Sequence, residues 1–191
     1  MILGSHNSLT YLKPTSILGR IFKGIGRCQR VDYKKQYELG VRYFDLRIRF
    51  NKKGDIEVAH GLNSYKISDK ELDSFVNWVG QTPDVYCRIL LELRKKVDDE
   101  DLQKEHFEYL CDALEITYPG KFFEGRVVYS WEQVYDFSYK PLYIEKHASV
   151  CSPKIVDDWY PLWYAKTKNK KIKRLYGKEG IIVYMDFVDI E

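Results

Sequence analysis

Alternating apolar and polar residues form several short runs in this chain, and segments with helical spacing lie between them. A period of two residues is typical of a strand, whereas apolar positions three and four residues apart are typical of a helix. The predicted strands are residues 1–4, 41–50, 56–62, 86–94, 126–131, 141–147 and 181–187. The predicted helices are residues 32–40, 68–81, 98–118 and part of 152–176, and 14–30 is predicted to be a loop or a frayed helix.

Local signals support the ends of these helices. Ser68, followed three residues later by Glu71, forms a capping box, so a helix is predicted to begin there. Gly40 is a stop signal for the helix before it. Acidic residues in the first turn of 98–118 interact favourably with the positive end of the helix dipole, which supports a helix that begins there. Pro161 is expected to break the helical part of the region that contains it.

Strands therefore alternate with helices over most of the chain, which predicts an α/β fold with mostly parallel strands. The 191 residues are enough for one domain with a sizeable core, and we interpret residues 1–191 as a single domain. The first and last predicted elements are both strands, as a closed barrel would allow.

Composition and charge exclude some classes of protein. Hydrophobic residues make up 45% of the chain and charged residues 31%, which is an ordinary globular balance. The net charge of +3 is too small to argue for nucleic acid, so no nucleic-acid partner is expected. No stretch of about 18 apolar residues occurs, which argues against a transmembrane helix.

The N-terminus and the cysteines indicate a compartment. The first residues have no basic segment and no long apolar run, so they do not resemble a signal peptide. We expect a cytoplasmic protein if Met1 is the native start, and a secreted one if the chain is an excised mature domain. No CxxC pair or His partner at metal spacing is present, so we expect reduced, mostly buried thiols at Cys28, Cys87, Cys111 and Cys151.

Two predicted strands have one apolar face and one charged face. In 41–50 the charged face includes Asp45, Arg47 and Arg49, and in 86–94 it includes Arg88, Glu92 and Arg94. For either strand alone, contact with water is the simpler explanation. Several such strands with helices on their apolar faces predict charges that converge inside a barrel, near the C-terminal strand ends. The residues in the C-terminal halves of their strands are Asp45, Arg47, Glu92, Arg94 and Asp186.

Three motifs in order resemble a known family. GSHNSLTY at 4–11, then GVRYFDLRIRF at 40–50, then VAHG at 58–61 look like the X-domain of phosphatidylinositol-specific phospholipases C. RILLELRKK at 88–96 resembles the next barrel strand of that family, and IVYMDF at 182–187 resembles its last strand. The resemblance implies a small, distorted or incomplete TIM-type (β/α) barrel.

The resemblance also implies a reaction. His6 would be the general base that takes the proton from the inositol 2-hydroxyl, whose oxygen attacks the neighbouring phosphorus. The products would be a cyclic phosphate and diacylglycerol. His60 would be the general acid that protonates the leaving oxygen, and Asp186 would hold His6 in the right tautomer. Asp45, in the same strand motif as Arg47, would belong to the same catalytic group.

The resemblance implies catalysis without a metal. Calcium-dependent members of the family have acids where this chain has Arg47 and Arg94, and two cations there argue against a Ca²⁺ site. Arg47 would instead grip phosphate oxygens and stabilise the pentacoordinate phosphorus. Asn7 departs from the aspartate usual in bacterial members: an amide donates to a phosphate oxygen but shares no proton with His60, whereas calcium-dependent members use asparagine there as a metal ligand. No cofactor is expected.

Candidates for substrate binding follow by position only. Glu92 shares the interior face with Arg94, and an internal ion pair between these two is the plain explanation for them. The remaining candidates that would hold the headgroup are Trp131, Tyr143, Lys146 and Tyr184.

A basic, aromatic segment could contact a membrane. Trp159 and Trp163 precede the basic run at 166–174, a combination that suits docking on an anionic surface. Packing of the aromatic rings on the barrel, with the lysines on a solvated helix face, is the slightly favoured explanation, because membrane insertion usually needs a clearly amphipathic segment. Three functions remain open: cleavage of phosphatidylinositol, cleavage of a soluble or cyclic phosphodiester, and binding of phosphate or lipid without catalysis.

Overall fold

The fold is described from a computed structural model, which describes residues 2–21, 26–118, 122–125, 132–134, 142–151, 161–172 and 181–190. The strands are β1 Ile2–Ser5, β2 Tyr43–Phe50, β3 Ile56–His60, β4 Asn63–Lys66, β5 Tyr86–Arg94, β6 Phe122–Gly125, β7 Glu132–Val134, β8 Leu142–Cys151 and β9 Ile181–Met185. The helices are α1 Ile17–Ile21, α2 Tyr33–Glu38, α3 Asp69–Gln81, α4 Glu100–Thr117 and α5 Pro161–Ile172.

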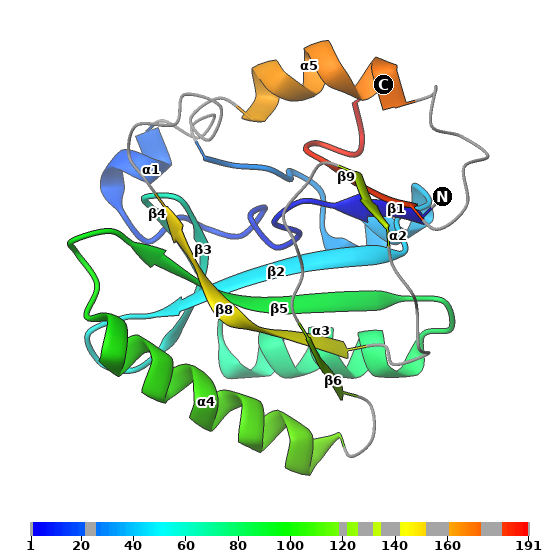
Figure 1. The fold of residues 1–191 in the computed structure, drawn as a ribbon. Coiled ribbons are helices and arrows are strands. Elements are labelled where there is room, and N and C mark those ends of the chain that lie inside the picture. The colour runs from blue at the N-terminus through cyan, green and yellow to red at the C-terminus, as the bar shows by residue number, and fades with distance from the viewer. Residues whose placement is uncertain are drawn as a thin grey trace.

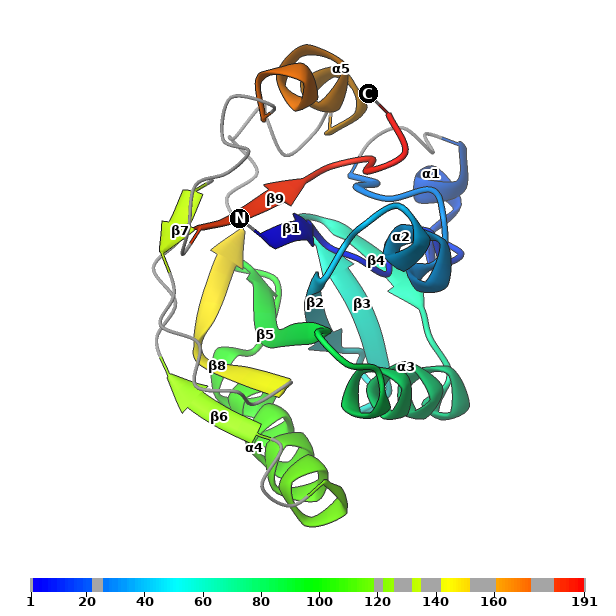
Figure 2. The same cartoon turned by 90° about the vertical axis from the view of Figure 1, so that its right-hand side faces the viewer.

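All the strands belong to one curled sheet (Figures 1 and 2). Its main path runs β6-β8-β5-β2-β1-β9-β7, and every neighbouring pair from β6 to β9 is parallel. β7 pairs antiparallel with β9, and the β3–β4 hairpin pairs through β3 with β2. Strands from the start and the end of the chain therefore lie side by side, next to the edge strand β7, as the incomplete barrel predicted from the sequence requires.

The apolar core lies between the outer face of the sheet and helices α3 and α4. Phe44, Leu46 and Ile48 of β2 meet Phe75 and Val79 of α3 there. The alternate residues of β5 join the same core, and so do Phe107 and Leu114 of α4. Ser68 and Glu71 form the capping box at the start of α3, as predicted. The other face of β2 and β5 is left for the charged residues.

The β3–β4 hairpin was not fully predicted from the sequence. The predicted strand 56–62 ends at His60, and a second strand, β4, follows after a two-residue loop. Gly61 adopts φ 56° in that loop, a conformation that a residue without a Cβ accepts most easily. In this hairpin His60 lies opposite Asn63, and the earlier residues of β3 pair with Ile48–Phe50 at the C-terminal end of β2.

Most of the other predicted elements are confirmed. Predicted strand 86–94 matches β5, and Gly40, with φ 96°, follows the end of α2. Pro161 is the first residue of α5, a position it can occupy because the first helical turn needs no N–H from that residue. The part of the predicted helical region before Pro161 lies outside the described residues. The predicted strand 126–131 lies outside the described residues. None of the helices in the described ranges is both long and apolar enough to cross a membrane.

Candidate active site

His6 and Asp186 face each other because β1 and β9 are neighbours. Each residue directly follows its strand, and the register pairs Ser5 with Met185. The His6 backbone N–H donates to the Met185 carbonyl at 3.0 Å, which extends the ladder by one step. The His6 Nδ1 then lies 2.8 Å from the Asp186 Oδ1. Since a carboxylate only accepts, Nδ1 carries a proton and Nε2 is the basic nitrogen of a neutral His6 ring.

His60 places a second imidazole beside the first. The ring centroids of His6 and His60 are 5.2 Å apart, with the planes at 87°. His60 Nδ1 lies 2.9 Å from the Gly26 carbonyl oxygen, which also accepts from the Tyr65 hydroxyl at 2.7 Å. A carbonyl oxygen has no proton to give, so His60 Nδ1 is the donor and the neutral ring is basic at Nε2.

The surroundings of His60 favour its neutral form. Burial lowers the pKa of His60 to about 4, and the positive fields of His6 and Arg47 add to this effect. The negative fields of Glu92 and Asp186 oppose it without reversing it. At neutral pH His60 is therefore an uncharged imidazole in the protein without substrate.

This shift predicts a pH-dependent stability. Between pH 6.5, the ordinary value for histidine, and about 4, the unfolded chain holds a proton on His60 that the folded protein does not. The free energy of unfolding should therefore fall as the pH drops through that window, by roughly 3 kcal/mol for this group. Urea unfolding of the metal-free protein at pH 7 and pH 4.5 measures it. His60→Gln should reduce the pH dependence, and His106→Gln should not; equal slopes in all three proteins would contradict the assignment.

A buried network of charged residues lies next to the two imidazoles. Asp45 accepts from Arg88 at 2.6 and 2.9 Å through Oδ1, and from Arg47 Nε at 3.0 Å through Oδ2. Arg47 Nη1 also donates to Glu92 Oε2 at 2.7 Å, and Arg49 Nη2 lies 3.7 Å from Glu92 Oε1. The sequence-based prediction that these charges converge inside the sheet is confirmed, because none of these side chains is more than 7% exposed.

The network is ionised and has an excess of positive charge. Burial alone would raise the pKa of Asp45, but Arg47 and Arg88 outweigh it and hold that pKa well below its usual range. The pKa of Glu92 is likewise lowered, against the effect of burial, by Arg47, His60 and Arg49. Three guanidinium groups thus face two carboxylates. The third buried carboxylate, Asp186, is paired with His6, so the positive excess favours an anionic ligand once that ring is protonated and the His6–Asp186 pair is neutral.

Asn7 adds a buried amide at the same place. Its backbone adopts φ 50°, and its N–H donates to Asp45 Oδ2 at 3.3 Å. Neither atom of its side-chain amide has a hydrogen-bond partner among the described residues, although the residue is fully buried. Burying an amide without a partner is costly, so this group is available for a ligand.

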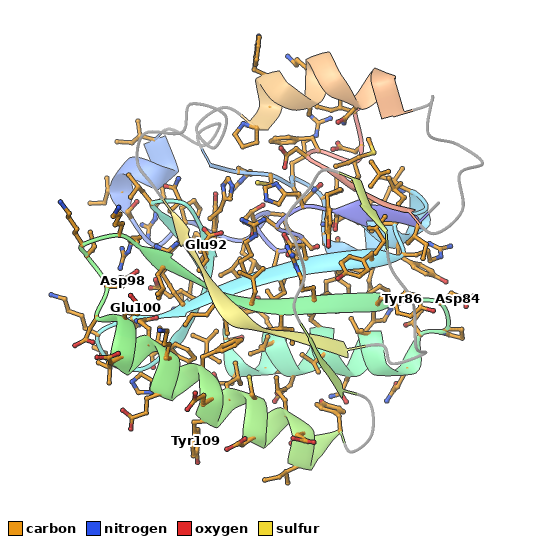
Figure 3. The ribbon with its side chains drawn as sticks, in the orientation of Figure 1. Asp84, Tyr86, Glu92, Asp98, Glu100 and Tyr109 are labelled. Atoms are coloured by element: carbon orange, nitrogen blue, oxygen red, sulfur yellow. The ribbon has the colours of Figure 1, made fainter. Side chains whose placement is uncertain are left out.

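Several predicted binding residues lie elsewhere. The expected Arg94–Glu92 ion pair is wrong, because Arg94 Nη2 pairs with Asp98 Oδ1 at 2.6 Å, while Glu92 pairs with the arginines of β2. Figure 3 labels Asp98 just before α4 and Glu92 on β5. The cause is local, because the turn after β5 brings the Asp98 carboxylate to the Arg94 backbone N–H as well, at 2.7 Å. Arg94 is therefore not part of the central network.

The headgroup candidates are placed only in part. Tyr184 is buried and makes an edge contact with Tyr43 at 5.5 Å, and its ring lies 5.4 Å from the Arg88 guanidinium carbon. Tyr143 and Lys146 belong to β8, where Tyr143 pairs in register with Arg88. Trp131 and Trp159 lie outside the described residues, and Trp163, in α5, is 63% exposed.

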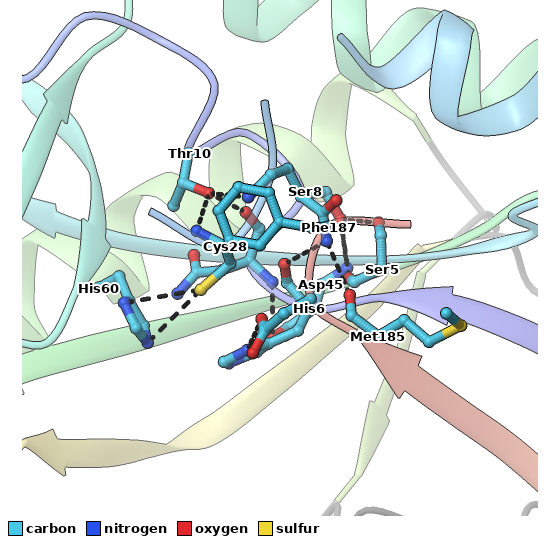
Figure 4. Close-up of polar contacts among 12 residues, drawn as sticks. Ser5, His6, Ser8, Thr10, Cys28, Asp45, His60, Met185 and Phe187 are labelled. Atoms are coloured by element: carbon cyan, nitrogen blue, oxygen red, sulfur yellow. Dashed lines mark hydrogen bonds and ion pairs between the residues drawn. The ribbon is translucent and has the colours of Figure 1, made fainter. Parts of the chain in front are cut away.

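The structure brings in residues that sequence reasoning did not select. Arg49 and Arg88 lie on the charged strand faces, so the alternation pattern could have identified them. Cys28 gave no such signal, because it lies in a segment between helices. Its Sγ is 3.6 Å from His60 Nδ1, a contact that the sequence spacing of the cysteines and histidines did not indicate (Figure 4). The expectation of free, mostly buried thiols is confirmed for the described cysteines, since Cys28 and Cys87 are buried and Cys111 is half-buried.

Comparison with known proteins gives matches among solved structures, and these matches rest on the fold. No protein-family model and no curated protein sequence matches this chain. A mutant form of the phosphatidylinositol-specific phospholipase C from Staphylococcus aureus superposes with a TM-score of 0.53 at 17% identity, over 97% of this chain and 84% of that one. The fold is shared. The phosphatidylinositol-specific phospholipase C from Listeria monocytogenes gives 0.52 at 13% identity, over 97% and 87% of the two chains.

This likeness confirms the fold class predicted from the sequence. The chain is a mixed α/β protein whose sheet curls as an incomplete barrel, in the arrangement of the bacterial phosphatidylinositol-specific phospholipases C. Its candidate site lies just beyond the C-terminal ends of β1 and β9 and extends along the inner face of β2 and β5, from the level of Asp45 and Arg88 to Glu92.

Proposed function

We propose that this chain is a phosphodiesterase whose substrate is phosphatidylinositol, cleaved through attack of a neighbouring hydroxyl on phosphorus. The observation that carries the proposal is the His6–Asp186 pair, at 2.8 Å, with a second imidazole 5.2 Å from the first beside a cationic network. A base held by a carboxylate, a second proton carrier and a fixed cation are the parts that this reaction needs.

His6 acts as the general base. Its Nδ1–H is held by Asp186, so Nε2 takes the proton from the hydroxyl of the substrate. The hydroxyl oxygen then forms a bond to phosphorus and closes a cyclic phosphate. Asp186 stabilises the imidazolium that results, because it accepts a hydrogen bond from the charged ring.

The phosphate is bound by the excess positive charge and by Asn7. Asp45 and Glu92 fix the Arg47 guanidinium from two sides, so its orientation does not have to be set during the reaction. The buried amide of Asn7 supplies a neutral donor for a phosphate oxygen. These contacts replace the charge that a divalent cation would supply, so the proposed reaction needs no calcium.

His60 supplies the proton to the leaving oxygen. The negative charge of the bound substrate favours the protonated form of His60 that this step needs. In the protein without substrate, the pKa of His60 is about 4. A bound phosphodiester brings a negative charge next to the ring, which favours the imidazolium form. His60 then carries its extra proton on Nε2, since Nδ1–H remains bonded to the Gly26 carbonyl.

A substrate panel with a metal chelator tests this proposal. Phosphatidylinositol vesicles and soluble phosphodiesters are supplied in parallel, and the cyclic phosphate is followed by ³¹P nuclear magnetic resonance. We expect a water-soluble inositol cyclic phosphate from the vesicles and undiminished rates in chelator. Cleavage of the soluble diesters alone would show that a soluble phosphodiester, and not phosphatidylinositol, is the substrate. Activity that is lost in chelator and restored by calcium would overturn the metal-free mechanism.

A further inference from the structure

Cys28 lies against the imidazoles instead of in the apolar core. Its Sγ is 3.6 Å from Nδ1 and 3.7 Å from Nε2 of His60, and the residue has no exposed surface (Figure 4). Cys87, which is also a fully buried free cysteine, packs in the apolar core between the sheet and the helices. Cys28 therefore does not simply fill space as a small apolar residue.

We propose that Cys28, His6 and His60 form a binding site for a zinc-type divalent transition metal ion. One ligand atom from each of the three residues lies within 4.8 Å of the other two. Zinc bonds of about 2.3 Å to sulfur and about 2.0 Å to nitrogen place tetrahedral ligand atoms roughly 3.5 Å apart. The separation of 3.7 Å between Sγ and His60 Nε2 already matches that spacing.

The hydrogen bonds around both rings are those that metal-binding histidines use. Asp186 accepts from His6 Nδ1 at 2.8 Å, and the Gly26 carbonyl accepts from His60 Nδ1 at 2.9 Å. Both neutral rings are therefore basic at Nε2, the nitrogen that would bind the ion. A carboxylate or carbonyl on the far nitrogen fixes the tautomer and the orientation of a ligand ring.

The position of Cys28 is fixed by its own backbone. Its N–H donates to Thr10 Oγ1 at 3.0 Å, and its carbonyl accepts from the Phe187 N–H at 2.6 Å. The next residue, Gln29, donates through Nε2 to the carbonyls of His6 and Met185, at 3.1 and 2.7 Å. The segment that carries the thiol is thus tied to the same strand ends that carry His6 and Asp186.

Occupation of this site would block the proposed reaction. On binding, the Cys28 thiol loses its proton to solvent and the thiolate forms a bond to the ion, with no change of oxidation state. The ion takes the Nε2 lone pairs of both rings, so neither can accept a proton. This inhibitory effect rests on the proposed function, whereas the metal site itself does not.

Spectroscopy with cobalt and zinc tests the site without any substrate. Tag-free, metal-free protein is titrated with Co²⁺, and we expect a thiolate-to-cobalt charge-transfer band that Zn²⁺ removes. Cys28→Ser should abolish the band and weaken Zn²⁺ binding on the order of 100-fold, whereas the matched control Cys111→Ser should change neither. An unchanged band in folded Cys28→Ser protein, checked by its thermal unfolding, or no Zn²⁺ binding by the unaltered protein, would overturn the proposal.

An activity measurement then separates the two proposals. The ratio of rates with and without added Zn²⁺ is compared between the unaltered protein and Cys28→Ser, so differences in basal rate cancel. We expect inhibition on the order of 10-fold or more in the unaltered protein, and much less in the variant. Zinc binding with no cleavage of any diester would uphold the metal site and overturn the proposed function, whereas cleavage that bound Zn²⁺ leaves unchanged would overturn the inhibitory role.

Discussion

Replacing His6 with alanine is expected to lower kcat/KM for phosphodiester cleavage by up to about 10⁴-fold, because the base that accepts the hydroxyl proton is lost. The 2.8 Å contact with Asp186 shows that His6 is held in one tautomer and is not a mobile surface ring. Steady-state rates on phosphatidylinositol vesicles measure the loss. Binding of vesicles by the variant, with no turnover, would also exclude a purely binding role for the chain.

His106→Ala provides the matched control for this substitution. His106 lies on α4, where its ring packs on Phe50 at 5.2 Å, whereas His6 follows β1 where that strand pairs with β9. We expect its kcat/KM to stay within about 2-fold of the unaltered value, since the ring touches no group of the site. Comparable losses in both variants would show that His6 acts through stability instead of proton transfer.

Asp45→Asn is expected to destabilise the protein by about 3–5 kcal/mol, because it removes one carboxylate from between two buried guanidinium groups. Asp45 is fully buried, and both of its oxygens accept from arginine side chains. An amide keeps the volume but supplies an N–H where a second acceptor is needed. Urea unfolding at pH 7 measures the change as a shift in midpoint.

Glu100→Gln is the control for loss of a carboxylate at the surface. Glu100 pairs with Lys104 at 2.7 Å on an exposed face of α4, where water already screens the pair. We expect little change in its unfolding midpoint. If Asp45→Asn proved as stable as this control, the buried network would contribute no net stability, and its role would be confined to holding Arg47.

Alternation along the strands was enough to predict which side chains share the interior. Period-two patterns in 41–50 and 86–94 separated Phe44, Leu46 and Ile89 from Asp45 and Glu92, and the structure separates them in the same way. The signal is strong because both faces of these strands are buried, so the charged face has to find partners of its own. The helix after Ser68 was equally predictable, since its capping box is a local feature.

The partners that residues find outside their own strand were beyond the reach of that reasoning. The direction of Arg94 depends on Asp98, a residue of the following turn, and a face pattern cannot show which partner an arginine at a strand end will choose. The second strand of the hairpin, NSYK, is short and lacks a clear apolar period. Cys28 reaches His60 only through the path of a segment that has no regular structure of its own.

The neighbouring placement of β1 and β9 has a consequence for how the protein is made. His6 and Asp186 are 180 positions apart in the chain, so the ribosome delivers the carboxylate long after the imidazole. A nascent chain that ends before β9 contains His6 and His60 but lacks Asp186, the carboxylate that orients His6. Because so distant a pairing also closes a very long loop, docking of the last strand should be among the slowest steps of maturation.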